Sequence, residues 1–112
     1  MIVNNLWNWN NYIVGWSLAG DLPGDYAVLL IHGFGANTNH WRFNQPVLAE
    51  LAPTYAIDLL GFGRSDQPRA RLKEEQPDDT AVHYGFDLWG QQVADFCREV
   101  IDKPVILVGN SI

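Results

Sequence analysis

Three short apolar segments dominate the pattern of this chain, and each of them ends in a turn that contains glycine. The segments cover residues 27–31, 55–57 and 105–108, and the turns read HGFG, DLLGFG and GNS. Continuous apolar strands are typical of a sheet that is covered on both faces. Amphipathic segments between them predict helices over about 41–51 and 87–101, which suit crossovers between parallel strands. We therefore predict an α/β architecture with a mostly parallel sheet and flanking helices.

The segments that precede this pattern are amphipathic rather than continuously apolar. Residues 7–9 and 12–18 predict two short strands, which we place antiparallel at the edge of the sheet. The chain contains five tryptophans, five phenylalanines and four tyrosines, so we expect large aromatic contacts. Cys97 lies on the apolar face of the second predicted helix, where a packed and unreactive thiol is the expectation.

Charge and composition narrow the classes of function. The formal net charge is −6, and the basic residues at 69, 71 and 73 are followed by acidic ones, which favours a solvated loop over a nucleic-acid surface. A single cysteine allows no internal disulfide and fits a reducing compartment. The N-terminus lacks the regions of a signal peptide, and the longest apolar run, 26–31, is far shorter than the ~20 residues that span a bilayer. We expect a cytoplasmic protein with no nucleic-acid partner and no transmembrane segment.

The last of the three turns carries the strongest chemical signal. Ligands of open α/β sheets bind beyond the carboxyl ends of the strands, where all three turns are predicted to meet. Gly109-Asn110-Ser111-Ile112 matches the first four positions of G-x-S-x-G, the turn that raises a nucleophilic serine above a sheet. In such a turn the N–H of the residue after the serine, here Ile112, faces the developing oxyanion. The alternative is an ordinary serine in a turn, but the preceding buried strand and amphipathic helix favour the nucleophile.

The turn after the first apolar strand fits the same chemistry. Its sequence is His32-Gly33-Phe34-Gly35, and a loop in this position supplies the second oxyanion donor of such sites. Here that donor is the Phe34 N–H. A plain strand–helix loop with glycines for turning is the alternative, and it leaves the later glycine–serine turn unexplained.

Three blocks together carry a family resemblance. "LLIHGFGANTNHW", "YAIDLLGFGRSDQP" and "ILVGNSI" resemble successive blocks of the α/β-hydrolase fold superfamily, and the match covers essentially the whole chain. Residues 1–112 are thus predicted to be the N-terminal part of a single α/β-hydrolase domain, cut after the nucleophile strand. Within the superfamily, "DLWGQQVADFCREVIDKPVILVGNSI" is most similar to pheophytinase-like serine hydrolases, which cleave the phytol ester of chlorophyll breakdown pigments.

The resemblance implies a function and a set of site residues. It favours hydrolysis of a carboxylic ester, while thioesterases, amidases, C–C hydrolases and cofactor-free haloperoxidase-like members stay open. It also implies an apolar small-molecule substrate, no cofactor and no metal, and it leaves the oligomeric state open. Ser111 is the implied nucleophile, and the Phe34 and Ile112 N–H groups are the implied oxyanion donors. The residues implied to support the two turns are His32, Gly33, Gly35, Gly109 and Asn110.

The remaining partners of the serine are not found in the chain. In this fold the acid and then the histidine follow the serine, and only Ile112 does so here. We expect His32 to support its loop, His40 to be a capping or surface residue, and His83 to be exposed. Asp58 and Ser65 are interpreted as structural, with Asp58 accepting backbone N–H bonds from the turn that follows it.

Three expectations follow for the chain as it stands. As a fragment it is expected to be inactive, and a lid that selects substrate is missing. Without a neighbour beyond residue 108, the last strand becomes a sheet edge, so we expect marginal stability or aggregation. Two alternatives to the enzyme remain, namely a non-catalytic ligand-binding member of the fold and a gene remnant.

Overall fold

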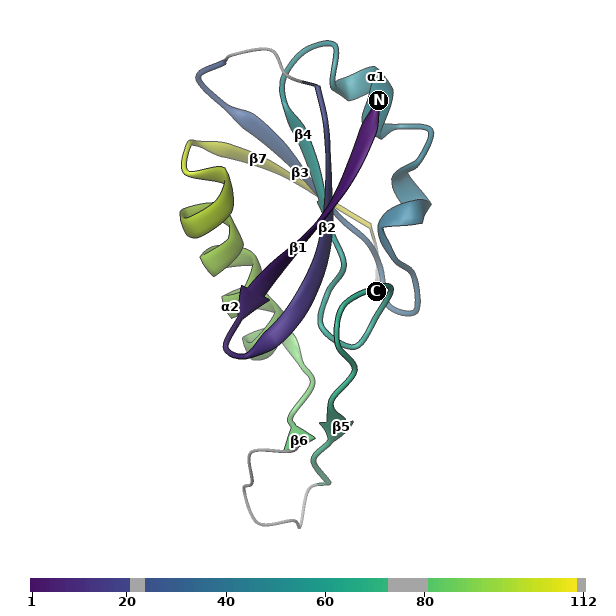
Figure 1. Cartoon of the computed structure of the whole chain (residues 1–112), viewed down its shortest axis with the longest axis vertical. Helices are drawn as coiled ribbons and strands as arrows, with labels where there is room; N and C mark the ends of the chain where they lie inside the picture. The colour runs from purple at the N-terminus through teal and green to yellow at the C-terminus, as the bar shows by residue number, and fades with distance from the viewer. Residues whose placement is uncertain (21–23, 73–80, 111–112) are drawn as a thin grey trace.

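The computed structural model describes residues 1–20, 24–72 and 81–110. Its main sheet has the strand order β1-β2-β4-β3-β7 (Figure 1). Strands β3, β4 and β7 are parallel to one another, whereas β1 pairs antiparallel with β2, and β2 antiparallel with β4. The strands are β1 Ile2–Trp9, β2 Tyr12–Ala19, β3 Ala27–Ile31, β4 Thr54–Ile57 and β7 Val105–Gly109. The predicted mostly parallel sheet with an antiparallel edge is confirmed.

Two helical regions cover opposite faces of this sheet (Figure 1). On one face lies α2, Phe86–Phe96, which continues into a π-helical turn, η2, Cys97–Ile101. Its predicted apolar face is confirmed, because Phe96 and Ile101 are buried in the core. Cys97 is packed against the same core, and burial raises the pKa of its thiol, as expected of an unreactive cysteine.

The helix predicted over 41–51 on the other face is wrong in extent. The segment forms a 3₁₀ turn, η1, Thr38–Trp41, and a single α-helical turn, α1, Gln45–Leu48. Pro46 occupies the first turn of α1, and a proline there has no N–H with which to continue a helix that began earlier. Leu48 packs against the sheet, but Val47 and Leu51 are 64% and 73% exposed. The apolar spacing therefore did not mark one continuous buried face.

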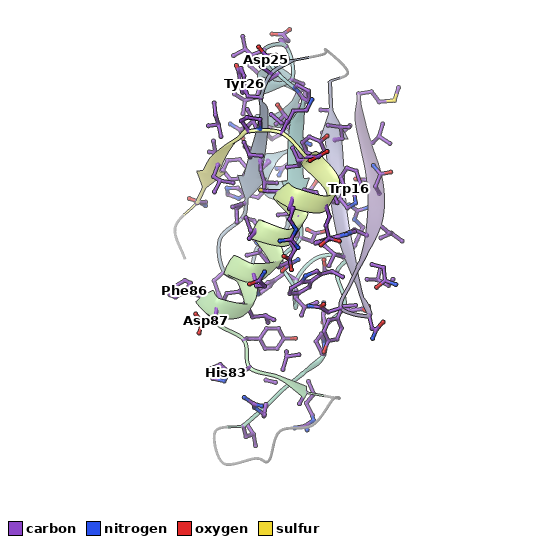
Figure 2. The ribbon with its side chains drawn as sticks, turned by 90° about the vertical axis from the view of Figure 1, so that its left-hand side faces the viewer. Trp16, Asp25, Tyr26, His83, Phe86 and Asp87 are labelled. Carbon is purple, nitrogen blue, oxygen red and sulfur yellow. The ribbon has the colours of Figure 1, made fainter. Side chains whose placement is uncertain are left out.

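The expected aromatic contacts join the β1–β2 hairpin to α2. The ring of Phe96 lies 5.4 Å from that of Trp7, 5.5 Å from that of Trp16 and 6.1 Å from that of Tyr55, all in edge-on arrangements. Figure 2 shows Trp16 beside α2 on the side of the hairpin. The indole N–H of Trp9 donates to Oδ2 of Asp95 at 2.8 Å. These contacts fix the antiparallel edge of the sheet on the helix.

At the opposite edge of the sheet, β7 has a single neighbour, β3, among the described strands. Ile106 and Leu107 on β7 are 51% and 55% exposed, although both are strongly apolar. The predicted edge strand is confirmed. The stability of such a chain stays a prediction.

A second, smaller sheet was not predicted. Its strands are β5 Arg69–Ala70 and β6 Ala81–Val82, which pair in parallel and project beyond the sheet near the start of α2 (Figure 1). Strands of two residues are too short to give a periodic signal, so the sequence pattern indicated only a charged loop. Part of that loop, 73–80, and the turn over 21–23 lie outside the described residues. Within the described residues, no helix is long and apolar enough to cross a membrane.

Candidate active site at the carboxyl ends of the parallel strands

The three glycine-containing turns lie side by side because their strands are neighbours. β3 pairs with β4 on one side and with β7 on the other, and Ile31 is in register with both Ile57 and Gly109. The Asn110 N–H donates to the carbonyl of Ile31 at 3.1 Å, which extends this pairing past the end of β7. Ser111, the predicted nucleophile, and Ile112, one of the two predicted oxyanion donors, lie outside the described residues. The structure thus places the strand that leads to them.

His32 links the loop after β3 to the turn after β4. Its Nε2 accepts the Leu59 N–H at 3.0 Å, and its Nδ1 lies 2.8 Å from the Gly33 carbonyl oxygen. Because Nε2 accepts a hydrogen bond, it must carry a lone pair and no proton. The ring proton is therefore on Nδ1, which donates it to the Gly33 carbonyl oxygen. The side chain is 1% exposed. Both nitrogens are therefore engaged, and neither is free to take a proton from a serine.

The loop that His32 holds turns tightly around Phe34. The Ala36 N–H donates to the Gly33 carbonyl at 3.1 Å, and Gly35 has φ +79°, a conformation that favours glycine. The Phe34 N–H makes no hydrogen bond to a described residue. Its side chain is 69% exposed, with the ring edge-on to Phe62 at 5.4 Å. In the part of the chain that the structure describes, this backbone donor at the carboxyl edge of the sheet is thus without a partner.

Asp58 fixes the other end of the same loop. One carboxylate oxygen accepts the Thr38 N–H at 2.7 Å, and the other accepts the Arg64 N–H at 3.2 Å. The bond from Arg64 confirms the predicted role of Asp58 in the following turn, whereas the bond from Thr38 was not predicted. Gly63 makes room for the carboxylate, since a Cβ there would lie 2.4 Å from Oδ1. With both oxygens occupied, Asp58 holds backbone in place.

Ser65 and Gln92 complete the hydrogen bonds of the turn after β4. The Ser65 hydroxyl donates to the Asp58 carbonyl at 2.6 Å and accepts the Gly15 N–H at 2.9 Å, which confirms its structural interpretation. Gln92 of α2 donates to the same carbonyl at 3.1 Å and accepts the Leu60 N–H at 2.9 Å. Sequence reasoning missed Gln92. The available signal was a polar residue adjoining the apolar face of α2.

The other histidines lie where they were expected, with one addition. His40 and His83 are both exposed, and His83 lies beyond the start of α2 (Figure 2). His40 also contacts the turn after β7, because its Nε2 lies 3.3 Å from Nδ2 of Asn110. This contact was not predicted, since spacing along the chain says nothing about loops that meet through the sheet. Among the described residues, no cluster of three or more His, Cys, Asp or Glu could hold a metal ion.

An apolar hollow of about 450 Å³ runs from this edge along the face of the sheet between α2 and β7. Leu107 forms one side of it, Trp89, Val93 and Cys97 form the other, and Asn110 lies at its end. The hollow is open and borders the free edge of β7.

Comparison with known proteins places the chain among proteins of related fold and varied activity. It is 34% identical over 95 residues to the 1-acylglycerol-3-phosphate O-acyltransferase ABHD5 of Sus scrofa, covering 85% of this chain and 25% of that protein. It is 32% identical over 105 residues to the chloroplastic pheophytinase of Arabidopsis thaliana, covering 77% of this chain and 22% of that protein. The predicted likeness to pheophytinase is confirmed. The chain spans about a quarter of the length of these relatives.

The fold agrees with that of solved hydrolases. A serine hydrolase involved in carbazole degradation superposes with a TM-score of 0.76 at 30% sequence identity, covering 99% of this chain and 39% of that one. Residues 26–112 match the sequence model of the alpha/beta hydrolase fold, and the chain therefore belongs to the α/β-hydrolase family.

Proposed function

We propose that the protein containing this chain is a serine hydrolase of carboxylic esters, with Ser111 as its nucleophile. The observation that carries the proposal is the Phe34 N–H, which has no hydrogen-bond partner among the described residues and lies in the loop beside the turn of Gly109 and Asn110. Two preorganised donors, Phe34 and Ile112, would bind the oxygen of the tetrahedral intermediate. Removing one donor of this kind typically costs about 100-fold to 1,000-fold in kcat.

The reaction needs a base that the described residues do not supply. The Ser111 oxygen would attack the ester carbonyl while a histidine takes its proton, and the alcohol would leave with that proton. A water would then attack the acyl-enzyme while the histidine takes the proton of the water and returns it to the Ser111 oxygen. This step would release the carboxylic acid. His32 is excluded as the base by its two hydrogen bonds. We propose that both the histidine and its acid come from a later segment of the protein, together with a lid.

Two observations support a longer domain of which residues 1–112 are the N-terminal part. The chain spans about a quarter of its relatives, and β7 leaves Ile106 and Leu107 exposed at its free edge. The crossover from β4 to β7 runs through α2, and right-handed connections place a further crossover in the same direction on the same face. A helix after residue 112 would thus enter the 450 Å³ hollow between α2 and β7.

Acyl transfer is a second candidate for the same site. The relatives named ABHD5 are acyltransferases, and they match this chain as well as the pheophytinase does. An acyl-enzyme on Ser111 can pass its acyl group to an alcohol instead of to water. A non-catalytic ligand-binding protein remains the alternative from another class.

The test is covalent labelling of the complete protein with a fluorophosphonate probe, which reacts with activated serines. We expect one labelled peptide that contains Ser111, and no label in the Ser111→Ala variant. A folded protein that takes up no label would contradict the proposal. Incubation of labelled ester with and without glycerol then separates hydrolysis, which releases free acid, from transfer, which yields a new ester.

A further inference from the structure

Four aromatic residues form a continuous row that begins at the candidate oxyanion donor. The ring of Phe62 lies 5.4 Å from that of Phe34 and 6.0 Å from that of Trp89, and Tyr84 lies 6.2 Å from Trp89. They come from the loop after β3, the turn after β4, α2 and the segment before α2. The aromatic row lines a hollow of about 470 Å³ together with Gly61, Gln67 and Pro68.

Hydrogen bonds hold the aromatic row in place, and they engage the polar groups of its Trp89 and Tyr84 side chains. The indole N–H of Trp89 donates to the Leu60 carbonyl at 3.0 Å, and the Tyr84 hydroxyl donates to the Pro68 carbonyl. Gly61 has φ +97°, and a Cβ there would lie 2.8 Å from the ring of Tyr84, so this ring packs directly on the turn. The hollow therefore presents ring surfaces that are already positioned, with few free hydrogen-bonding groups.

The angles between the rings decide which apolar group fits. Phe34 and Phe62 meet at 75°, Phe62 and Trp89 at 42°, and Trp89 and Tyr84 at 36°. A rigid planar group can lie flat on only one of these rings at a time. A flexible hydrocarbon chain can follow the turns between them. The volume of about 470 Å³ is within the ~300–1,000 Å³ of typical small-molecule sites.

We propose that the aromatic row binds a long alkyl chain of the ester substrate. This inference rests on the proposed function, because it places the alkyl chain of the substrate next to the Phe34 N–H and hence next to the reacting carbonyl. The hydrocarbon runs from Phe34 toward Tyr84, away from the turn of Gly109 and Asn110. Pro68 and Tyr84, which contact each other and flank β5 and β6, are part of this substrate site.

A substitution that fills the hollow tests the proposal in the complete protein. Gln67 is exposed at its margin, and Gln67→Trp adds bulk inside it. Esters with a butyl or dodecyl chain, on the acyl side in one series and the alcohol side in another, are compared by kcat/KM. We expect a dodecyl preference of about tenfold or more in one series, from partial burial of the added methylenes. Gln67→Trp should reduce that preference through KM.

Glu50→Trp is the matched control, since it adds the same side chain at an exposed position on the α1 side of the sheet. It should keep the dodecyl preference. The proposal is overturned if Gln67→Trp lowers kcat/KM equally for butyl and dodecyl esters, or if naphthyl esters exceed dodecyl esters and lose this advantage in Gln67→Trp.

Binding measured without turnover separates this inference from the proposed function. The Ser111→Ala protein is titrated with 1-decanol and with 2-naphthol by calorimetry. We expect decanol to bind more tightly, and its Kd to rise about tenfold in the Gln67→Trp background. If Ser111 takes no fluorophosphonate label, this titration still shows whether the aromatic row binds an alkyl chain. Equal decanol binding with and without Gln67→Trp overturns the inference even where Ser111 is labelled.

Discussion

Leu59 donates its N–H to Nε2 of His32 at 3.0 Å, and this bond joins the turns that follow two neighbouring parallel strands. The Nδ1 of this histidine donates to the carbonyl of Gly33, at the start of the loop that contains the Phe34 N–H. A buried histidine at the carboxyl edge of a sheet invites assignment as a catalytic base. Its hydrogen bonds assign it instead to the positioning of the loop that contains Phe34.

Replacing His32 by alanine should therefore weaken both the fold and the reaction. The substitution leaves the buried Leu59 N–H without its acceptor, and an unsatisfied buried group costs about 1–3 kcal/mol. We expect a loss of that size in the free energy of unfolding by urea, and a fall in kcat that exceeds any rise in KM. His83→Ala, at an exposed position, should change neither quantity. An unaltered unfolding midpoint in His32→Ala would contradict the assignment.

Ser65 offers a test that separates a structural serine from a nucleophile. Its hydroxyl makes two buried hydrogen bonds, so Ser65→Ala should lower the free energy of unfolding by about 1–3 kcal/mol. Fluorophosphonate labelling per folded molecule should persist. In Ser111→Ala the reverse is expected, with stability retained and labelling lost. Loss of labelling in folded Ser65→Ala would move the nucleophile away from Ser111.

Gly63 should tolerate no side chain. It has φ +57°, and a Cβ would lie 2.4 Å from Oδ1 of Asp58, whose carboxylate holds the Thr38 N–H. Gly63→Ala is expected to cost about 1–3 kcal/mol of stability, because the backbone is strained and the hydrogen bonds of the buried Asp58 carboxylate are displaced. Gly24→Ala is the control, since its Cβ would find its nearest atom at 3.5 Å. Similar thermal midpoints for the two variants would show that Asp58 moves aside without cost.

The attachment of the hairpin to α2 should make stability depend on pH. The hydrogen bond from the Trp9 indole, opposed by burial and aided by Gln91 and Arg98, holds the pKa of Asp95 below its usual range. A lowered pKa in the folded state means that ionised Asp95 favours folding above the unfolded pKa. This contribution is lost as pH falls through the folded value.

As pH falls below about 5 and through the folded pKa of Asp95, the free energy of unfolding is therefore expected to fall more steeply in the wild-type protein than in Asp95→Asn. The variant should also be less stable near neutral pH. Trp9→Phe keeps an aromatic ring but removes the indole N–H, and it should flatten the same part of the curve. Parallel curves for all three proteins would exclude Asp95 as the titrating group.

The isolated chain of residues 1–112 is expected to be marginally stable or to aggregate. Ile106 and Leu107 lie exposed on a strand with one neighbour, and such edges pair with other chains. Sedimentation should show concentration-dependent association, and Leu107→Lys should reduce it. A monodisperse chain with a cooperative unfolding transition and dispersed amide signals would refute the expectation.

The sequence predicts those parts of the fold in which a pattern of apolar residues continues over several positions or helical turns. Strand β3 is apolar at every position, and α2 repeats its apolar face over several turns. The helix predicted over 41–51 failed because Val47, Leu48 and Leu51 have helical spacing, yet Pro46 limits α1 to one turn. Strands β5 and β6 were not predicted, because a strand of two residues is too short to show a period in its sequence.

The candidate site divides along a similar line. The turns of Gly33 and Gly109 are recognisable because their glycines and their place after strands are local properties of the sequence. The bonds from Gln92 to Asp58 and from Asn110 to His40 join residues that are far apart in the chain. No single-sequence pattern encodes such meetings. They follow from the strand order, which decides which turns become neighbours.

The loop around Phe34 is tied to one turn at both of its ends, by His32 to Leu59 and by Thr38 to Asp58. Neither end can therefore leave that turn without breaking one of these two hydrogen bonds, and only the few residues between them are free to fluctuate. Hydrogen exchange should report this division, with the Leu59 and Thr38 amides protected to a similar degree and the Phe34 amide exchanging much faster. A donor that exchanges readily with solvent on a frame that rarely opens is available to a substrate oxygen without any rearrangement of the backbone.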